Sequence, residues 1–313
     1  MFKKRILVFA TLLGVTGTLF FVFGASKTPV IDDDTSKLTY QSDGDVDENI
    51  NIAESDDLPI RLNPEFPEKI DNPHNPCYSL EVSEEIKENK LNFSENINKT
   101  DVLNRSILEK SELPLEIFRG NENIRSVALT IDTGVGGIEG VGQLLDLAEH
   151  YNIDLTFFVT GCWVLENPEL TQEILIKGHS LGNHSLSHLN LSKASVASIE
   201  REIGETSRII EEVAGFQPIF FRKPQYAGGD IIVKMAGDYG MISIQGYPDL
   251  GDTGGWHSDS SPEGVFRRVK NGTSPGAIWV FHNLSLSDLK AFEDIIRFHL
   301  EEGYKLVKIE EII

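Results

Sequence analysis

Residues 127–134 read VALTIDTG, and this stretch decides how the second half of the chain is built. Its first five residues are apolar or β-branched, which is typical of a buried β-strand. Asp132, Thr133 and a glycine follow at once. A lone carboxylate at the end of a buried strand needs a partner, because an unpaired buried charge is costly. We therefore expect Asp132 to pair with Arg222, which ends a later apolar run.

Six further short apolar runs follow this first one. They cover residues 155–159, 180–182, 219–221, 241–244, 278–281 and 305–307. Segments with helical spacing lie between most of them, at residues 141–151, 168–177, 194–214, 230–239 and 288–302. Strands that alternate with helices pair in parallel, because each helix carries the chain back across the sheet. Seven such units predict an α/β fold that closes like a barrel, with an open doubly wound sheet as the alternative.

The chain has 313 residues, enough for this domain, placed at residues 121–313, and for two further segments. Residues 1–25 join a basic start to a charge-free apolar run, which predicts a signal peptide or a membrane anchor. The basic start stays in the cytoplasm, so the rest is expected to be extracytoplasmic, either secreted or anchored in the membrane. Residues 26–120 hold 22 acidic and 10 basic residues, which predicts an acidic, largely disordered linker or stalk.

The charge and the cysteines limit the partners of the chain. A formal net charge of −21 argues against nucleic acid, since binding to phosphates needs clustered lysine and arginine. A neutral or positively charged substrate fits better. Cys77 lies in the predicted stalk and Cys162 in the predicted domain. The count permits one disulfide in an oxidising compartment, but a single pair with one member in a flexible stalk is weak evidence for it, so we expect two unpaired thiols.

Polar residues follow several of the predicted strands, at the ends where chemistry gathers in such folds. His184 and His188 are four residues apart, so a single helical turn would let both imidazoles share a cation. His282 ends an apolar strand, where a buried structural histidine is the alternative. Asp249 and Asp252 follow the fifth strand. We expect all these side chains to meet at one rim of the barrel.

Several stretches, in this order, resemble the polysaccharide deacetylase family, the NodB-homology type of carbohydrate esterase. They read VALTIDTG at 127–134, TFFVTG at 156–161, GHSLGNHSLSH at 178–188, FRKPQY at 221–226, PGAIWVFH at 275–282 and GYKLV at 303–307. The resemblance runs from about residue 126 to residue 312. It implies a distorted (β/α)7 barrel, which agrees with the seven strands counted above.

The resemblance also implies a divalent metal ion, with zinc as the expected metal, held by His184, His188 and Thr133. The family usually has an aspartate where this chain has Thr133, so a neutral hydroxyl replaces an anionic ligand. The implied activity is a hydrolase that removes N-acetyl groups from an extracellular or cell-wall polysaccharide, peptidoglycan-like or chitin-like. The alternative is a catalytically silent carbohydrate-binding or scaffold protein on the same barrel, because Thr133 would weaken the metal site.

The resemblance implies that Asp132, oriented by Arg222, is the general base and that His282 is the general acid. Either Asp249 or Asp252 would stabilise the imidazolium form of His282.

The implied substrate-binding residues are Gln225, Tyr226 and Trp256. A backbone N–H near Gln225 or Tyr226 would stabilise the oxyanion. The family motif usually reads Arg-Pro-Pro-Tyr, whereas here the tyrosine is shifted by one position.

Overall fold

The computed structural model describes residues 28–31, 38–41, 116–134 and 137–313. The predicted signal or anchor segment and most of the predicted stalk lie outside these residues and stay predictions. The chain divides into two units, Met1–Leu62 and Asn63–Ile313. In the first unit, β1 (Thr28–Ile31) pairs antiparallel with β2 (Leu38–Gln41). Within the described ranges no helix has the length and apolar character to span a membrane.

The second unit is built on a curved sheet of parallel strands. β4 (Ser126–Thr133) pairs with β5 (Thr156–Val159) along one edge and with β9 (Ile278–His282) along the other. The sheet continues from β5 through the strands β6 (Ser180–Asn183), β7 (Phe220–Phe221) and β8 (Ile242–Ile244). β10 (Lys305–Leu306) pairs with the first residues of β4. The seven predicted strands are all present, and the predicted distorted barrel is confirmed.

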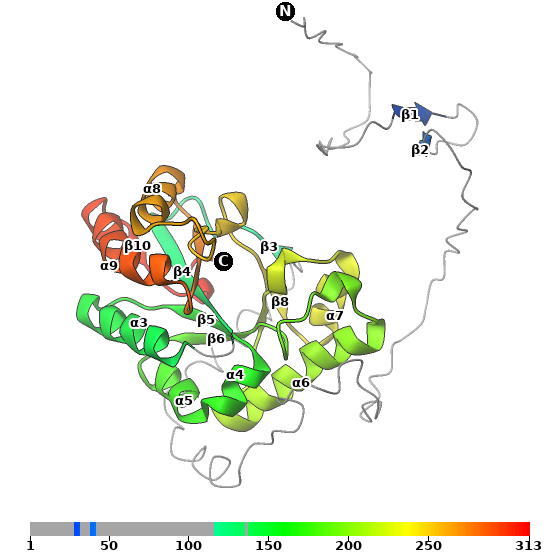
Figure 1. Cartoon of the computed structure of the whole chain (residues 1–313), viewed down its shortest axis with the longest axis horizontal. Helices are drawn as coiled ribbons and strands as arrows, with labels where there is room; N and C mark the ends of the chain where they lie inside the picture. Colours follow the sequence, from blue (N-terminus) through cyan, green and yellow to red (C-terminus); the bar gives the residue numbers. More distant parts are fainter. Residues whose placement is uncertain (1–27, 32–37, 42–115, 135–136) are drawn as a thin grey trace, which may run out of the picture. The chain divides into compact units, whose positions relative to one another are not determined.

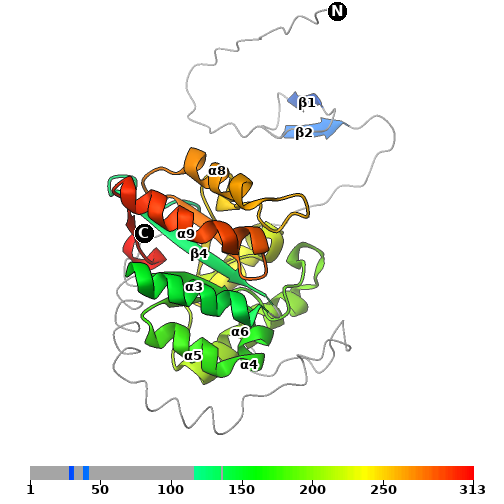
Figure 2. The same ribbon diagram turned by 60° about the vertical axis from the view of Figure 1, so that its left-hand side comes forward.

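Helices surround the sheet, as Figures 1 and 2 show. They are α3 (Ile138–Tyr151), α4 (Gly161–Glu166), α5 (Pro168–Ile176), α6 (Val196–Ala214), α7 (Asp230–Asp238), α8 (Pro262–Gly272) and α9 (Leu286–Glu301). The sequence predicted five of these and missed α4 and α8. α4 has only six residues, too few for a helical period to be visible, and α8 is mostly polar.

The two faces of β4 meet different layers, because successive side chains of a strand point to opposite sides. Val127, Leu129 and Ile131 pack with residues of α3 and α9 in the cluster between sheet and helices. Ala128 lies in the inner cluster with side chains of the other strands. The polar residues at the end of β4 therefore stand at the rim of a barrel whose interior is filled.

The first strand of the sheet precedes residue 121, where the composition of the sequence changes. β3 (Glu116–Ile117) pairs in parallel with β8. The carboxylate of Glu116 lies 2.7 Å from Lys223 Nζ and accepts a hydrogen bond of 2.9 Å from Gln245 Nε2. A strand of two residues carries no periodicity, and so the sequence could not predict it.

The prediction of two unpaired thiols is wrong, because Cys162 is disulfide-bonded. The side chain of Cys162 is buried at the start of α4. The sequence has one other cysteine, Cys77, which lies outside the described residues.

Candidate active site

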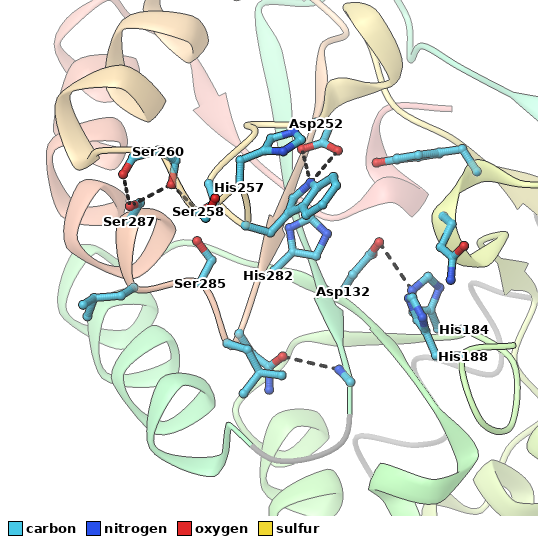
Figure 3. A pocket seen from close by; sticks show the side chains of 18 residues that line it. Asp132, His184, His188, Asp252, His257, Ser258, Ser260, His282, Ser285 and Ser287 are labelled. Carbon is cyan, nitrogen blue, oxygen red and sulfur yellow. Dashed lines mark hydrogen bonds and ion pairs between the residues drawn. The ribbon is translucent and has the colours of Figure 1, made fainter. Parts of the chain in front are cut away.

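A pocket of about 1000 Å³ opens at the carboxyl ends of the strands (Figure 3). Most of the predicted site residues line it: Asp132, His184, His188, Gln225, Tyr226, Asp252, Trp256 and His282. Arg222 lies beneath the pocket as the partner of Asp132. Thr133 and Asp249 are not among the lining residues. Figure 3 shows Asp132 between His282 on one side and the two other histidines on the other.

Asp132 and Arg222 form a buried ion pair, as the sequence predicted. Arg222 Nη1 donates to Asp132 Oδ1 at 2.7 Å and to the Thr130 hydroxyl at 2.8 Å. Nε and Nη2 donate to the carbonyls of Ile244 and Gln245. Burial opposes the ionisation of Asp132, but Arg222, His184 and His282 together outweigh burial and hold the pKa of the carboxyl below its usual value. Asp132 is therefore ionised, and its position is fixed.

His184 presents a bare ring nitrogen to the pocket. Its Nδ1 donates to the carbonyl of Arg222 at 3.0 Å, and because a carbonyl only accepts, Nδ1 carries the hydrogen. Nε2 is buried, has no hydrogen-bond partner in the described ranges and lies 3.5 Å from Asp132 Oδ2. Burial lowers the pKa of His184 to about 4, which keeps the ring neutral. A neutral imidazole with its far nitrogen tied to a carbonyl is how histidine binds metals.

His188 completes the histidine pair. The two ring centroids are 5.0 Å apart, and burial lowers the pKa of His188 as well. Among the described residues there is no group of three His, Cys, Asp or Glu side chains poised around a metal position. Thr133 is fully buried, and its hydroxyl has no hydrogen-bond partner. The donor set thus fits a cation through two neutral histidines, with Asp132 as the nearest anionic neighbour.

Glu202 of α6 anchors the loop that carries the two histidines, and the sequence analysis missed it. It is buried and accepts hydrogen bonds from the backbone N–H and the hydroxyl of Ser187, at 2.8 and 2.7 Å. The loop needs such an anchor because Ser185 and His188 adopt left-handed backbone conformations, with φ of 66° and 58°.

The carboxylate nearest to the ring of His282 is Asp288, which was not among the predicted ones, although the predicted Asp252 also raises the pKa of His282. Asp288 Oδ2 accepts the His282 backbone N–H at 3.0 Å and lies 3.5 Å from Nδ1 of the ring. Burial disfavours the imidazolium, but the carboxylates of Asp288, Asp132 and Asp252 together outweigh burial and raise the pKa of His282. Asp252 instead accepts the indole N–H of Trp256, at 3.0 to 3.2 Å.

A local signal for Asp288 was present in the sequence. Residues 285–288 read SLSD, a serine followed three residues later by an acid, which marks the start of a helix. Ser285 does cap α9, because its hydroxyl accepts the backbone N–H of Asp288. The cap fixes the place of Asp288, which is buried beside His282.

The predicted substrate-binding residues lie on two sides of the pocket. Trp256 is 56% exposed and stacks on His257, with ring centroids 3.9 Å apart. Gln225 is exposed, and its side-chain oxygen accepts a hydrogen bond from Asn190. The side chain of Tyr226 lines the pocket. Its backbone N–H donates to the carbonyl of Lys223 at 3.1 Å, so it is not available to an oxyanion.

Residues 119–244 match the family described as "Polysaccharide deacetylase". The peptidoglycan-N-acetylglucosamine deacetylase PgdA of Listeria monocytogenes is 29% identical over 210 residues, 67% of this chain and 43% of that protein. The peptidoglycan-N-acetylmuramic acid deacetylase PdaC of Bacillus subtilis is 30% identical over 192 residues, 61% of this chain and 39% of that protein. The matches span less than half the length of each of these two relatives.

A solved structure with the same fold is that of a CE4 family pseudoenzyme from Bacillus anthracis. It is 30% identical, with a TM-score of 0.60, and the match covers 64% of this chain and 70% of that one. A mutant of the same protein, described as having restored enzymatic activity, is 32% identical, and 72% of that chain is covered.

Proposed function

The chain belongs to the polysaccharide deacetylase family, and from this premise we propose that it is a metal-dependent hydrolase that removes N-acetyl groups from a cell-wall or other extracellular polysaccharide. The observation that carries the proposal is the arrangement in one pocket of an ionised carboxylate, a histidine with a raised pKa and a pair of neutral histidines. These are the parts that amide hydrolysis requires.

Asp132 acts as the general base. Its carboxylate takes a proton from the water whose oxygen adds to the carbonyl carbon of the acetamide. The ion pair with Arg222 keeps the carboxylate deprotonated and aimed at the pocket. Because the pKa of Asp132 is low, the base is deprotonated at neutral pH. The same low pKa makes it a weak base, which limits how strongly it attracts the proton of the water.

His282 acts as the general acid. As the carbon–nitrogen bond breaks, the protonated imidazole gives a proton to the departing sugar amine, and acetate is the second product. The raised pKa of His282 increases the fraction that carries this proton at neutral pH. Base and acid then stand side by side in the pocket with opposite charges, which supports the ionised state of each.

His184 and His188 are the residues that would hold the divalent cation. The bare Nε2 of His184 supports this, because a buried ring nitrogen without a partner is costly unless a ligand occupies it. When bound, such a cation polarises the acetamide carbonyl and the water. Zinc is the metal that we propose, since neutral imidazoles are among its usual ligands.

The substrate that we propose is an N-acetylated glycan of the peptidoglycan or chitin type. The exposed indole of Trp256, held by Asp252, offers a flat apolar face beside the reacting groups, which suits a sugar ring. We place the activity outside the cytoplasm, secreted or membrane-anchored, because residues 1–25 read as an export segment.

The proposal is tested by measuring acetate release from chitin oligomers and from peptidoglycan by the full chain, with and without added zinc. We expect release that a chelator stops and zinc restores. In the same assay His184→Ala should abolish both activity and zinc binding while the circular dichroism spectrum stays unchanged. No release from any glycan at saturating zinc would contradict the proposal.

A second candidate is a silent carbohydrate-binding protein on the same barrel. Two observations favour it: Thr133 stands where the family usually has an aspartate, and a similar structure is that of a pseudoenzyme. Glycan binding without acetate release, in a protein that takes up no zinc, would identify this function.

A further inference from the structure

Tyr226 lies in a backbone conformation that few residues adopt. Gln225 and Tyr226 both have positive φ, 57° and 53°, inside the short turn Pro224–Tyr226. This conformation costs free energy for residues other than glycine. Two such residues in succession at the rim of a pocket indicate that the surrounding structure holds the turn in place. The turn uses the backbone N–H of Tyr226 for its own hydrogen bond to Lys223, so whatever this residue offers a ligand comes from its side chain.

The hydroxyl of Tyr226 is buried and has no hydrogen-bond partner within the described part of the chain, although the residue lines the pocket. A buried hydroxyl without a partner destabilises the folded protein, and phenylalanine would fill the same space without that cost. Burial, reinforced by the nearby negative charge of Asp132, raises the pKa of Tyr226. The phenol therefore keeps its proton and is a hydrogen-bond donor without an acceptor among the residues that the structure describes.

Tyr226 lines the same pocket as the groups that take part in the proposed hydrolysis. Tyr226 shares the pocket with Asp132, His184, His188 and His282. Each of these has a task in the proposed hydrolysis, but none of them is a neutral donor for the carbonyl oxygen of the acetamide. That oxygen gains negative charge when the water oxygen adds to the carbonyl carbon, and donors placed at this position lower the barrier.

We propose that the side-chain hydroxyl of Tyr226 is a catalytic group that donates a hydrogen bond to the carbonyl oxygen of the scissile acetamide as that oxygen becomes an oxyanion. The inference rests on the proposed function. No bond to Tyr226 forms or breaks. The proton of the water goes to Asp132, the departing amine takes a proton from His282, and the oxyanion returns its electron pair when the carbon–nitrogen bond breaks. The hydroxyl thus takes the place of the backbone N–H of Tyr226, one of the two backbone donors expected from the sequence.

The test is Tyr226→Phe, which removes only the oxygen. We expect kcat for acetate release to fall by roughly 10²- to 10³-fold, the loss typical of one oxyanion donor, with KM little changed. Zinc affinity should equal that of the wild type. The thermal unfolding midpoint should stay level or rise, because the variant loses a buried hydroxyl that has no partner.

The matched control is Tyr151→Phe, which removes a hydroxyl that donates to Glu293 on the outer side of α3 and α9. It should leave kcat unchanged. If the wild type is active and Tyr226→Phe is equally active, the inference about Tyr226 is overturned and the proposed function stands. Lost activity together with a lowered unfolding midpoint would also overturn it, since the hydroxyl would then be structural. An inactive wild type would overturn the proposed function and, with it, the inference.

Discussion

Replacing Arg222 by methionine should destabilise the protein far more than any surface substitution. Arg222 is fully buried, and its guanidinium lies 3.9 Å from the centre of the Phe158 ring. It donates to Asp132, to Thr130 and to two backbone carbonyls. Methionine would fill much of the same space and keep the contact with the ring, but it would leave each of these polar groups without its donor.

The size of the effect follows from these contacts. Removing one partner of a buried ion pair costs about 3–5 kcal/mol, because the other charge stays buried and uncompensated. The carbonyls of Ile244 and Gln245 also lose a donor, at about 1 kcal/mol or more each. We therefore expect Arg222→Met to lower the free energy of unfolding by about 5 kcal/mol. With a urea slope of about 2 kcal/mol/M, the midpoint would fall by about 2.5 M.

Urea unfolding at pH 7, followed by circular dichroism, measures this loss. Adding Asp132→Asn to Arg222→Met should restore part of the stability, because it removes the uncompensated charge. The control is Arg208→Met, whose half-buried ion pairs on α6 should contribute about 1 kcal/mol or less. A loss below 1 kcal/mol for Arg222→Met, or a double variant no more stable than the single one, would refute the reasoning.

The same comparison has a predicted pH dependence. The pKa of Asp132 is lower in the folded protein than its usual 3.8, so the ion pair contributes stability above pH 3.8 and loses it as the pH falls through the folded pKa. The stability of the wild type should therefore fall as the pH drops below 3.8. Arg222→Met should not show this acid loss, because burial without the guanidinium raises the pKa of Asp132 in the folded variant.

Three further predictions follow from the site and the sheet. Asp288→Asn should lower the pKa of His282, so that the alkaline limb of the pH–rate profile moves to lower pH. Asp252→Asn should move this limb less. An alkaline limb that stays in place in Asp288→Asn would contradict the prediction. Glu202→Gln should weaken zinc binding about 10- to 100-fold in a chelator competition, whereas Glu205→Gln on the same helix should not weaken it. Equal zinc affinities of the two variants would show that Glu202 does not hold the loop with the two histidines in place. A chain that begins at residue 121 should fold but unfold at lower temperature than one that begins at residue 114, because it lacks β3; identical unfolding curves would show that β3 adds nothing.

The sequence predicted those parts of the site that lie at the ends of regular elements. Asp132 and His282 end buried strands, and His184 follows one, so the parallel order of the strands alone was enough to bring them to one rim. The pairing of Asp132 with Arg222 followed from the cost of burying a lone charge. These inferences needed no knowledge of distances.

Other parts of the site could not be found in this way. Asp249 and Asp252 were predicted because they follow a strand, whereas Asp288 lies inside a predicted helix, and only the packed structure shows its carboxylate beside His282. The disulfide of Cys162 could not be predicted from the sequence either, because the spacing of two cysteines far apart in the chain does not give their distance in space.

The sequence by itself determined the α/β order, the strand ends that carry the chemistry and the family, because periodicity and motifs are local properties of the chain. Only the tertiary structure decided which carboxylate serves His282, that Glu202 holds the histidine loop, and that the hydroxyl of Tyr226 is buried without a partner. These three facts depend on contacts between separate elements. A hydrogen bond or a buried hydroxyl is defined to within about an ångström, and that precision exists only once the helices have packed against the sheet.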